Sequence, residues 1–161
     1  MMKSMLISSI FVLCSVTLHA QKFEHFNLQQ SETYKSWRLY ANFEEKFEGK
    51  TGIWYFGDYH AEVLNMLRKQ ILTLPKRIQQ ILRNSDVRIN FLFDKDGTIF
   101  SVYFYGIQSL PTILSDSDWL ALYRAILQIK LDVSKLEIPD REDFEVGEAV
   151  SFLIKKLLQT E

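Results

Sequence analysis

The stretch from Val87 to Tyr105 constrains the fold more than any other, because two apolar runs flank a short polar segment. Apolar residues occupy alternate positions of the first run, V-R-I-N-F-L-F, as in a strand with one buried face. The polar segment Asp94-Lys95-Asp96-Gly97-Thr98 then leads into the second run, I-F-S-V-Y-F-Y. Gly97 can adopt the positive φ angle that a tight reversal needs, and Asp side chains accept hydrogen bonds from turn N–H groups. The sequence therefore predicts a central β-hairpin.

Two registers are open for this hairpin. A two-residue loop pairs Phe93 with Phe100, whereas a three-residue loop ending in Gly97 pairs Phe93 with Ile99. In the second register, a β-bulge near Phe100 returns the apolar residues from Val102 onward to the buried face. We favour the bulged register.

The composition indicates one ordered domain without a polyanionic partner. The chain has 161 residues, of which 47% are hydrophobic and 14% aromatic, and this is enough for a core without disulfides. The formal net charge is −1, and no basic stripe is present to attract phosphates. We therefore expect no nucleic-acid partner.

The first twenty residues, Met1–Ala20, have the pattern of a secretory signal peptide. Lys3 supplies the positive start, residues 5–16 are apolar, and Ala20 is a small residue at the cleavage point. The apolar part is shorter than the roughly 20 residues that span a bilayer. We expect a periplasmic or secreted chain, Gln21–Glu161, with no stable membrane insertion after cleavage.

Cys14, the single cysteine of the chain, lies within this signal. A lipid-attachment cysteine follows a small residue, whereas Phe11-Val12-Leu13 precede Cys14, so we do not expect a lipoprotein. The cleaved chain has no cysteine, which excludes disulfides and thiol catalysis.

Between the signal and the hairpin, several elements are expected. Residues 21–30 fit either an extended arm or an edge strand. Aromatic residues recur at near-helical spacing over residues 31–48, which favours a helix; the alternative is a strand pair through residues 37–40 and 53–56. Two helical stretches follow from Asp58 to Leu82, interrupted by Pro75.

Two elements are expected after the hairpin. Ser115 and Asp118 form a capping-box pattern that begins a helix over residues 116–130. At the C-terminus, alternating apolar residues favour a closing strand over residues 146–154, although helical spacing fits nearly as well. The fold class is α+β: a small, mainly antiparallel sheet built on the hairpin at 87–105, with helices packed on one face.

The order of these elements resembles the C-terminal domain of TonB-type energy transducers. The resemblance covers Val87 to Ile154 and rests on the alternating strands, the Asp94-Lys95-Asp96-Gly97 turn, the helix from Asp116 and the terminal run Val150-x-Phe152-x-Ile154. The proline-rich spacer of that family is missing, so the resemblance implies the fold and no activity. In size and layout the chain is also similar to small exported proteins of unknown function from Bacteroides-like bacteria.

No pattern typical of a catalytic or metal site emerges, so we predict no catalytic residue, metal ligand or cofactor. The Asp94 turn lacks the twelfth-position Glu of a calcium loop, and Asp116 and Asp118 suit helix capping. After the signal, His25 and His60 stand in unrelated segments, so a metal site would have to be assembled in space.

One constellation is a candidate ligand site. Trp54, Tyr55, Asp58, Tyr59 and His60 place aromatic rings beside a carboxylate and an imidazole where a strand leads into a helix. Such a surface could stack on a sugar or hold a peptide, although core packing also accounts for aromatic residues of this kind.

The leading functional hypothesis is a non-enzymatic binding module of the cell envelope. It would hold a protein or a glycan by a sheet edge or by the aromatic constellation. One alternative is a periplasmic hydrolase-like enzyme with its site between sheet and helices, using Asp58 and His60 as acid and base. The other is a structural protein that forms a homodimer through an edge strand.

Overall fold

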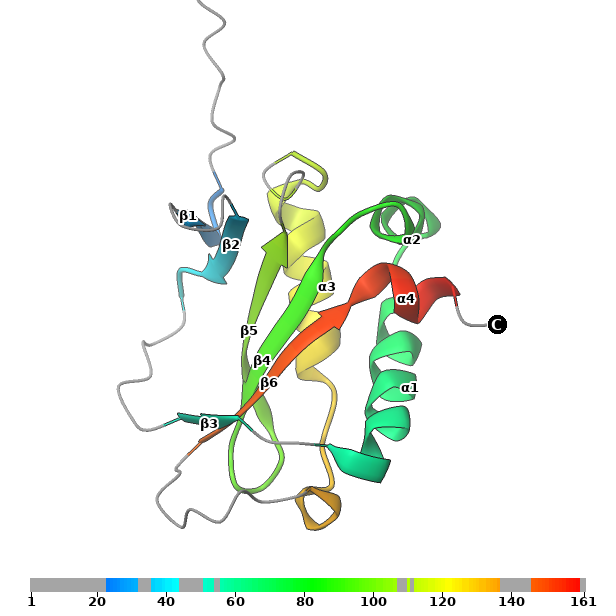
Figure 1. Cartoon of the computed structure of the whole chain (residues 1–161). Coiled ribbons are helices and arrows are strands. Elements are labelled where there is room, and N and C mark those ends of the chain that lie inside the picture. Colours follow the sequence, from blue (N-terminus) through cyan, green and yellow to red (C-terminus); the bar gives the residue numbers. More distant parts are fainter. Residues whose placement is uncertain are drawn as a thin grey trace, which may run out of the picture.

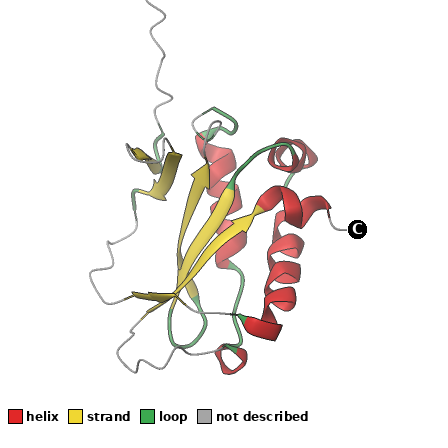
Figure 2. Ribbon diagram, in the orientation of Figure 1, coloured by secondary structure: helices red, strands yellow, loops and turns green. Residues whose placement is uncertain are grey.

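The structure is a computed structural model, and it describes residues 23–31, 36–43, 51–53, 56–106, 110, 112–136 and 146–159. Within these ranges one sheet carries helices on one face, as Figures 1 and 2 show. The strands are β1 (Phe26–Ser31), β2 (Ser36–Ala41), β3 (Thr51–Ile53), β4 (Arg88–Phe93), β5 (Ile99–Gly106) and β6 (Val146–Leu153). The α-helices are α1 (His60–Ile71), α2 (Lys76–Arg83), α3 (Asp116–Leu127) and α4 (Ile154–Gln159).

The strand order is β1-β2-β5-β4-β6-β3. Neighbouring strands are antiparallel except β3 and β6, which are parallel. The predicted fold class, an α+β domain with a mainly antiparallel sheet, is confirmed. The β4–β5 hairpin occupies the middle of the sheet, so β1 and β3 are its two edge strands.

The hairpin has the bulged register. Phe93 pairs with Ile99 and Leu92 pairs with Ser101, so Phe100 is the extra residue between them. Gly97 has a φ of +78°, and a Cβ there would lie 2.1 Å from the carbonyl oxygen of Leu131. Only glycine therefore fits this turn without strain.

The core lies between the sheet and the helices. Residues 89, 91 and 93 of β4 point toward the helices and are almost completely buried. From α3, Trp119 packs its ring 4.8 Å from that of Phe104 on β5. Side chains alternate between the two faces of a strand, so every second residue of β4 faces the helices.

The helix favoured over residues 31–48 is wrong where the structure describes this stretch, because residues 36–41 form strand β2. Leu39 and Ala41 are buried, while Tyr40 lies on the opposite face of the sheet. The alternative strand pair is right about strand character for residues 37–40 and for Ile53, but not for Phe56, and it is wrong about pairing. β2 lies between β1 and β5, whereas β3 pairs with β6 at the far edge.

The remaining elements follow the sequence pattern closely. Pro75 separates α1 from α2, and α3 begins with a capping box between Ser115 and Asp118. α3 ends at Leu127, three residues before the expected end. The C-terminal run is a strand, as favoured, and passes directly into the short helix α4. Of the two alternatives for residues 21–30, the edge strand is found from Phe26 onward as β1.

Among the described residues, no helix combines the length and the apolar character needed to cross a membrane. The predicted signal peptide, residues 1–20, lies outside the described residues.

Candidate functional site

The residues of the predicted aromatic constellation take different environments. Asp58 is exposed in a short 3-10 helix. Tyr59 is buried, and its hydroxyl accepts a hydrogen bond from the backbone N–H of Asp132 at 2.9 Å. His60 is exposed and stacks its ring 5.7 Å from that of Phe152. Trp54 and Tyr55 lie outside the described residues.

These placements divide the constellation between core and surface. Tyr59 belongs to the packing between α1 and the loop after α3, while Asp58 and His60 remain accessible. No hydrogen bond or ion pair joins Asp58 to His60 in the described part of the chain. The hydrolase alternative, which uses these two residues as acid and base, stays a prediction.

The face of the sheet away from the helices carries a polar and aromatic network. Asn90 on β4 donates to the hydroxyl of Tyr103 on β5 at 2.9 Å, and that hydroxyl donates to Glu148 on β6. The Tyr103 ring lies 5.9 Å from that of Tyr40 on β2, whose hydroxyl donates to Gln29 on β1. This network links five neighbouring strands across one face.

The network also changes the ionisation of its members. Burial, together with the hydrogen bond to Glu148, raises the pKa of Tyr103, so its hydroxyl stays protonated at physiological pH. A hydrogen bond to Tyr40 raises the pKa of Arg38 on the same face. Among the described residues of this face, the hydroxyls of Tyr40 and Tyr103 are therefore tied into hydrogen bonds.

Strand β1 presents a backbone edge that no described strand covers. The His25 carbonyl accepts from the N–H of Asn42 at 2.9 Å, and the paired register continues from Phe26 opposite Ala41. Hydrogen-bonded and non-bonded pairs alternate in an antiparallel ladder, so Phe26, Leu28 and Gln30 direct their backbone groups away from β2. No described strand pairs with this side.

The free edge lacks the features that usually prevent strand addition. Natural edge strands are often very short, bulged, or protected by charged residues and proline. β1 has six residues, F-N-L-Q-Q-S, with no charge, no proline and an uninterrupted register against β2. The other edge strand, β3, has only three residues. β1 is therefore the edge of this sheet suited to accept a further strand.

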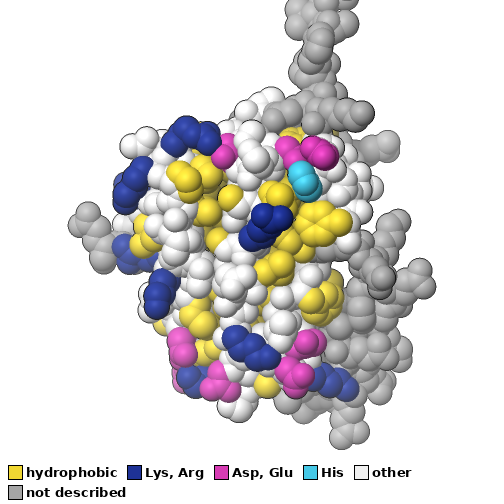
Figure 3. Space-filling view, turned by 180° about the vertical axis from the view of Figure 1, so that it is seen from behind, with side chains coloured by type: hydrophobic (Ala, Val, Ile, Leu, Met, Phe, Trp, Pro, Cys, Tyr) yellow, Lys and Arg dark blue, Asp and Glu magenta, His cyan; other side chains and the backbone are white. Residues whose placement is uncertain are grey.

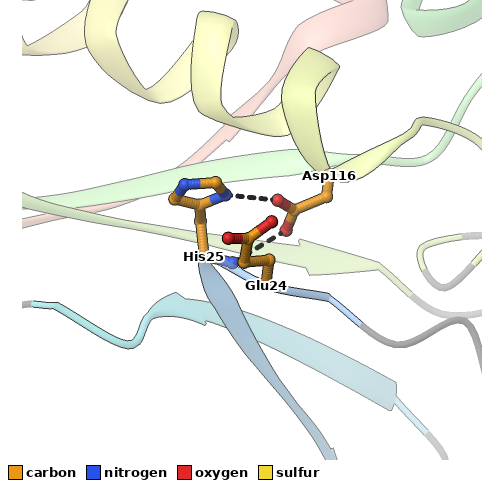
Figure 4. Close-up of side chains that lie close together, drawn as sticks. All are labelled: Glu24, His25 and Asp116. Atoms are coloured by element: carbon orange, nitrogen blue, oxygen red, sulfur yellow. Dashed lines mark hydrogen bonds and ion pairs between the residues drawn. The ribbon is translucent and has the colours of Figure 1, made fainter.

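Immediately before β1, three potential metal ligands converge. Glu24 and His25 meet Asp116 from the first turn of α3, as Figure 4 shows. The backbone N–H of His25 donates to Asp116 Oδ1 at 3.1 Å, and His25 Nδ1 is hydrogen-bonded to Asp116 Oδ2. One ligand atom from each residue lies within 4.8 Å of the others. The two hydrogen bonds between His25 and Asp116 join the start of β1 to α3.

The surroundings of this cluster hold it in place. Asn42 donates its backbone N–H to the His25 carbonyl and its side-chain amide to the Glu24 carbonyl. The side chains of His25 and Asp116 are 38% and 20% exposed, so solvent reaches both. On the molecular face in Figure 3, a histidine lies between acidic and apolar side chains.

Comparison with known protein families, with curated proteins and with solved structures finds no match for this chain.

Sequence reasoning placed His25 in an isolated segment and treated Asp116 as a capping residue. The structure brings the two together across 91 residues of sequence. No local spacing in the sequence could have indicated this contact. His25 lies just before the first strand, whereas Asp116 lies in α3, in the second half of the chain. The free edge of β1 was anticipated only as one of two alternatives.

Proposed function

We propose that the protein is an exported, non-enzymatic binding module of the cell envelope that holds an extended peptide segment of a partner protein along strand β1. The observation that carries this proposal is the unprotected outer edge of β1. Backbone N–H and C=O groups at such an edge can hydrogen-bond to an added strand, which gives affinity without a particular sequence.

The side chains along β1 suggest what the partner segment looks like. Phe26 is buried and Leu28 is half-buried, both on the helix side, while Asn27 and Gln29 lie on the open side. In a strand added beside β1, every second side chain would lie on the helix side, next to Phe26 and Leu28, and the others would lie on the open side. The expected partner is an uncharged segment with apolar residues at every second position.

The test uses a proline that removes one outward N–H group. Gln30 is exposed and directs its N–H away from β2, so Gln30→Pro should leave the native ladder intact while blocking strand addition. Gln30→Ala is the matched control, because it removes the same side chain and keeps the N–H. Circular dichroism and thermal unfolding should show both variants folded.

The probe is a set of decapeptides selected from a random displayed library on the immobilised protein. We expect selected peptides to shift the amide resonances of residues 26–31, to bind Gln30→Ala like the wild type, and to bind Gln30→Pro about tenfold more weakly or worse. Failure to select peptides, shifts confined to other elements, or equal binding by both variants would contradict the proposal. A dimer that Gln30→Pro dissociates would assign the edge to a second copy instead.

A further inference from the structure

We infer that Glu24, His25 and Asp116 form a binding site for a divalent transition-metal cation of the Zn²⁺ type. One imidazole nitrogen and two carboxylate oxygens make up this ligand set, and these are the donor types that Zn²⁺ accepts in proteins. The inference does not rest on peptide capture by β1, because it concerns other residues and a different ligand.

The distances fit a metal centre after a small adjustment. Zinc bonds of about 2.0–2.2 Å in tetrahedral geometry place ligand atoms about 3.4 Å apart. The three ligand atoms now lie within 4.8 Å of one another. Glu24 is exposed and can approach by side-chain rotation alone, while His25 and Asp116 need only separate slightly to admit the ion between them.

The charge at the cluster favours a cation. Two carboxylates converge on one imidazole, and among the described residues no lysine or arginine forms an ion pair with Glu24 or Asp116. The Glu24 carboxylate likewise has no hydrogen-bond donor within the described ranges. A bound cation would therefore supply positive charge that no described lysine or arginine brings to these two carboxylates.

The backbone around the cluster is already ordered. The carbonyls of Glu24 and His25 accept hydrogen bonds from Asn42, and the N–H of His25 donates to Asp116 Oδ1. A site whose supporting groups are fixed in advance loses less entropy when it binds an ion. Three protein ligands leave a fourth position for water or for a partner side chain.

The test is titration of the purified, chelator-treated protein with ZnCl₂ by isothermal calorimetry. We expect one Zn²⁺ bound per chain and an affinity about tenfold weaker or worse in Glu24→Gln and in His25→Ala. His60→Ala is the matched control, because it removes an exposed imidazole from a different element, α1. Mg²⁺ and Ca²⁺, which prefer shells of six or more oxygens, should show no comparable binding.

Glu24→Gln also separates metal binding from simple misfolding. Its carboxylate has no protein partner in the described residues, so metal-free Glu24→Gln should unfold at the wild-type temperature. Zinc should raise the unfolding temperature of the wild type more than that of this variant. Absence of stoichiometric zinc binding, or equal affinity in wild type, Glu24→Gln and His25→Ala, would reduce the cluster to an ion pair and overturn the inference.

Discussion

At the residue scale, Asp118 shows how one carboxylate can serve two partners in the first turn of α3. It accepts a hydrogen bond from Arg77 of α2 at 2.7 Å and completes the capping box with Ser115. Burial works to raise the pKa of Asp118, but the hydrogen bonds from Arg77 and Ser115 outweigh it and hold this pKa below its usual value. The ionised form therefore stabilises both the helix start and its contact with α2.

This pKa shift predicts a stability change with pH. Because the pKa of Asp118 is lower in the folded state, its contribution is present at neutral pH and disappears as the pH falls below about 4. Urea unfolding at pH 7 and at pH 3 should show that Asp118→Asn loses less stability on acidification than the wild type. Equal losses in the two proteins would contradict this assignment.

At the element scale, the sequence predicted those elements whose pattern and local turn chemistry agree. The Asp94 turn with Gly97 set the hairpin register, and Ser115 with Asp118 set the start of α3. In the region of β2 a helix was favoured over the strand, because aromatic residues recur there at near-helical spacing. Tyr40 fits a helical stripe in the sequence, yet in the structure it lies on β2, between β1 and β5, on the face of the sheet away from the helices. Pairing on both sides decided that element: β1 directly precedes β2 in the chain, but β5 is distant in sequence.

The open face of the sheet offers a prediction at this scale. Tyr103→Phe should lower the free energy of unfolding by roughly 1–3 kcal/mol, because Asn90 and Glu148 lose their shared partner in a half-buried network. Tyr105→Phe is the control: it lies on the same strand and face, and its hydroxyl has no hydrogen bond within the described residues. Urea denaturation should show a change in Tyr105→Phe of about 0.5 kcal/mol or less. Equal losses in both variants would argue against the network.

At the scale of the whole molecule, the sequence established the fold class and left the sites open. The hairpin, the helices and the terminal strand follow from short-range patterns. The cluster around His25 and the free edge of β1 depend instead on strand order, which places residues 24–31 beside β2 and α3. Periodicity reports which face of an element is buried, but not which element lies beside it. The His25 cluster could therefore not be derived from the sequence, and the edge of β1 was only one of two alternatives.

Export itself can be tested on the whole chain. Expressed with its own N-terminus in a Gram-negative host, the protein should appear in the periplasmic fraction with an intact mass that begins at Gln21, because residues 1–20 form the predicted signal. In Ala20→Phe, a bulky residue at the cleavage point should leave residues 1–20 attached. A wild-type mass that begins at Met1 would contradict the prediction.

The position of β6 has a consequence for how the sheet is completed. This strand lies between β4 and β3, and among the described strands β3 has no other partner. In a polypeptide synthesised from its N-terminus, one side of β4 lacks its partner strand until residues 146–153 emerge. A chain truncated before β6 would therefore expose an unpaired edge of β4, which is a site for pairing with other chains.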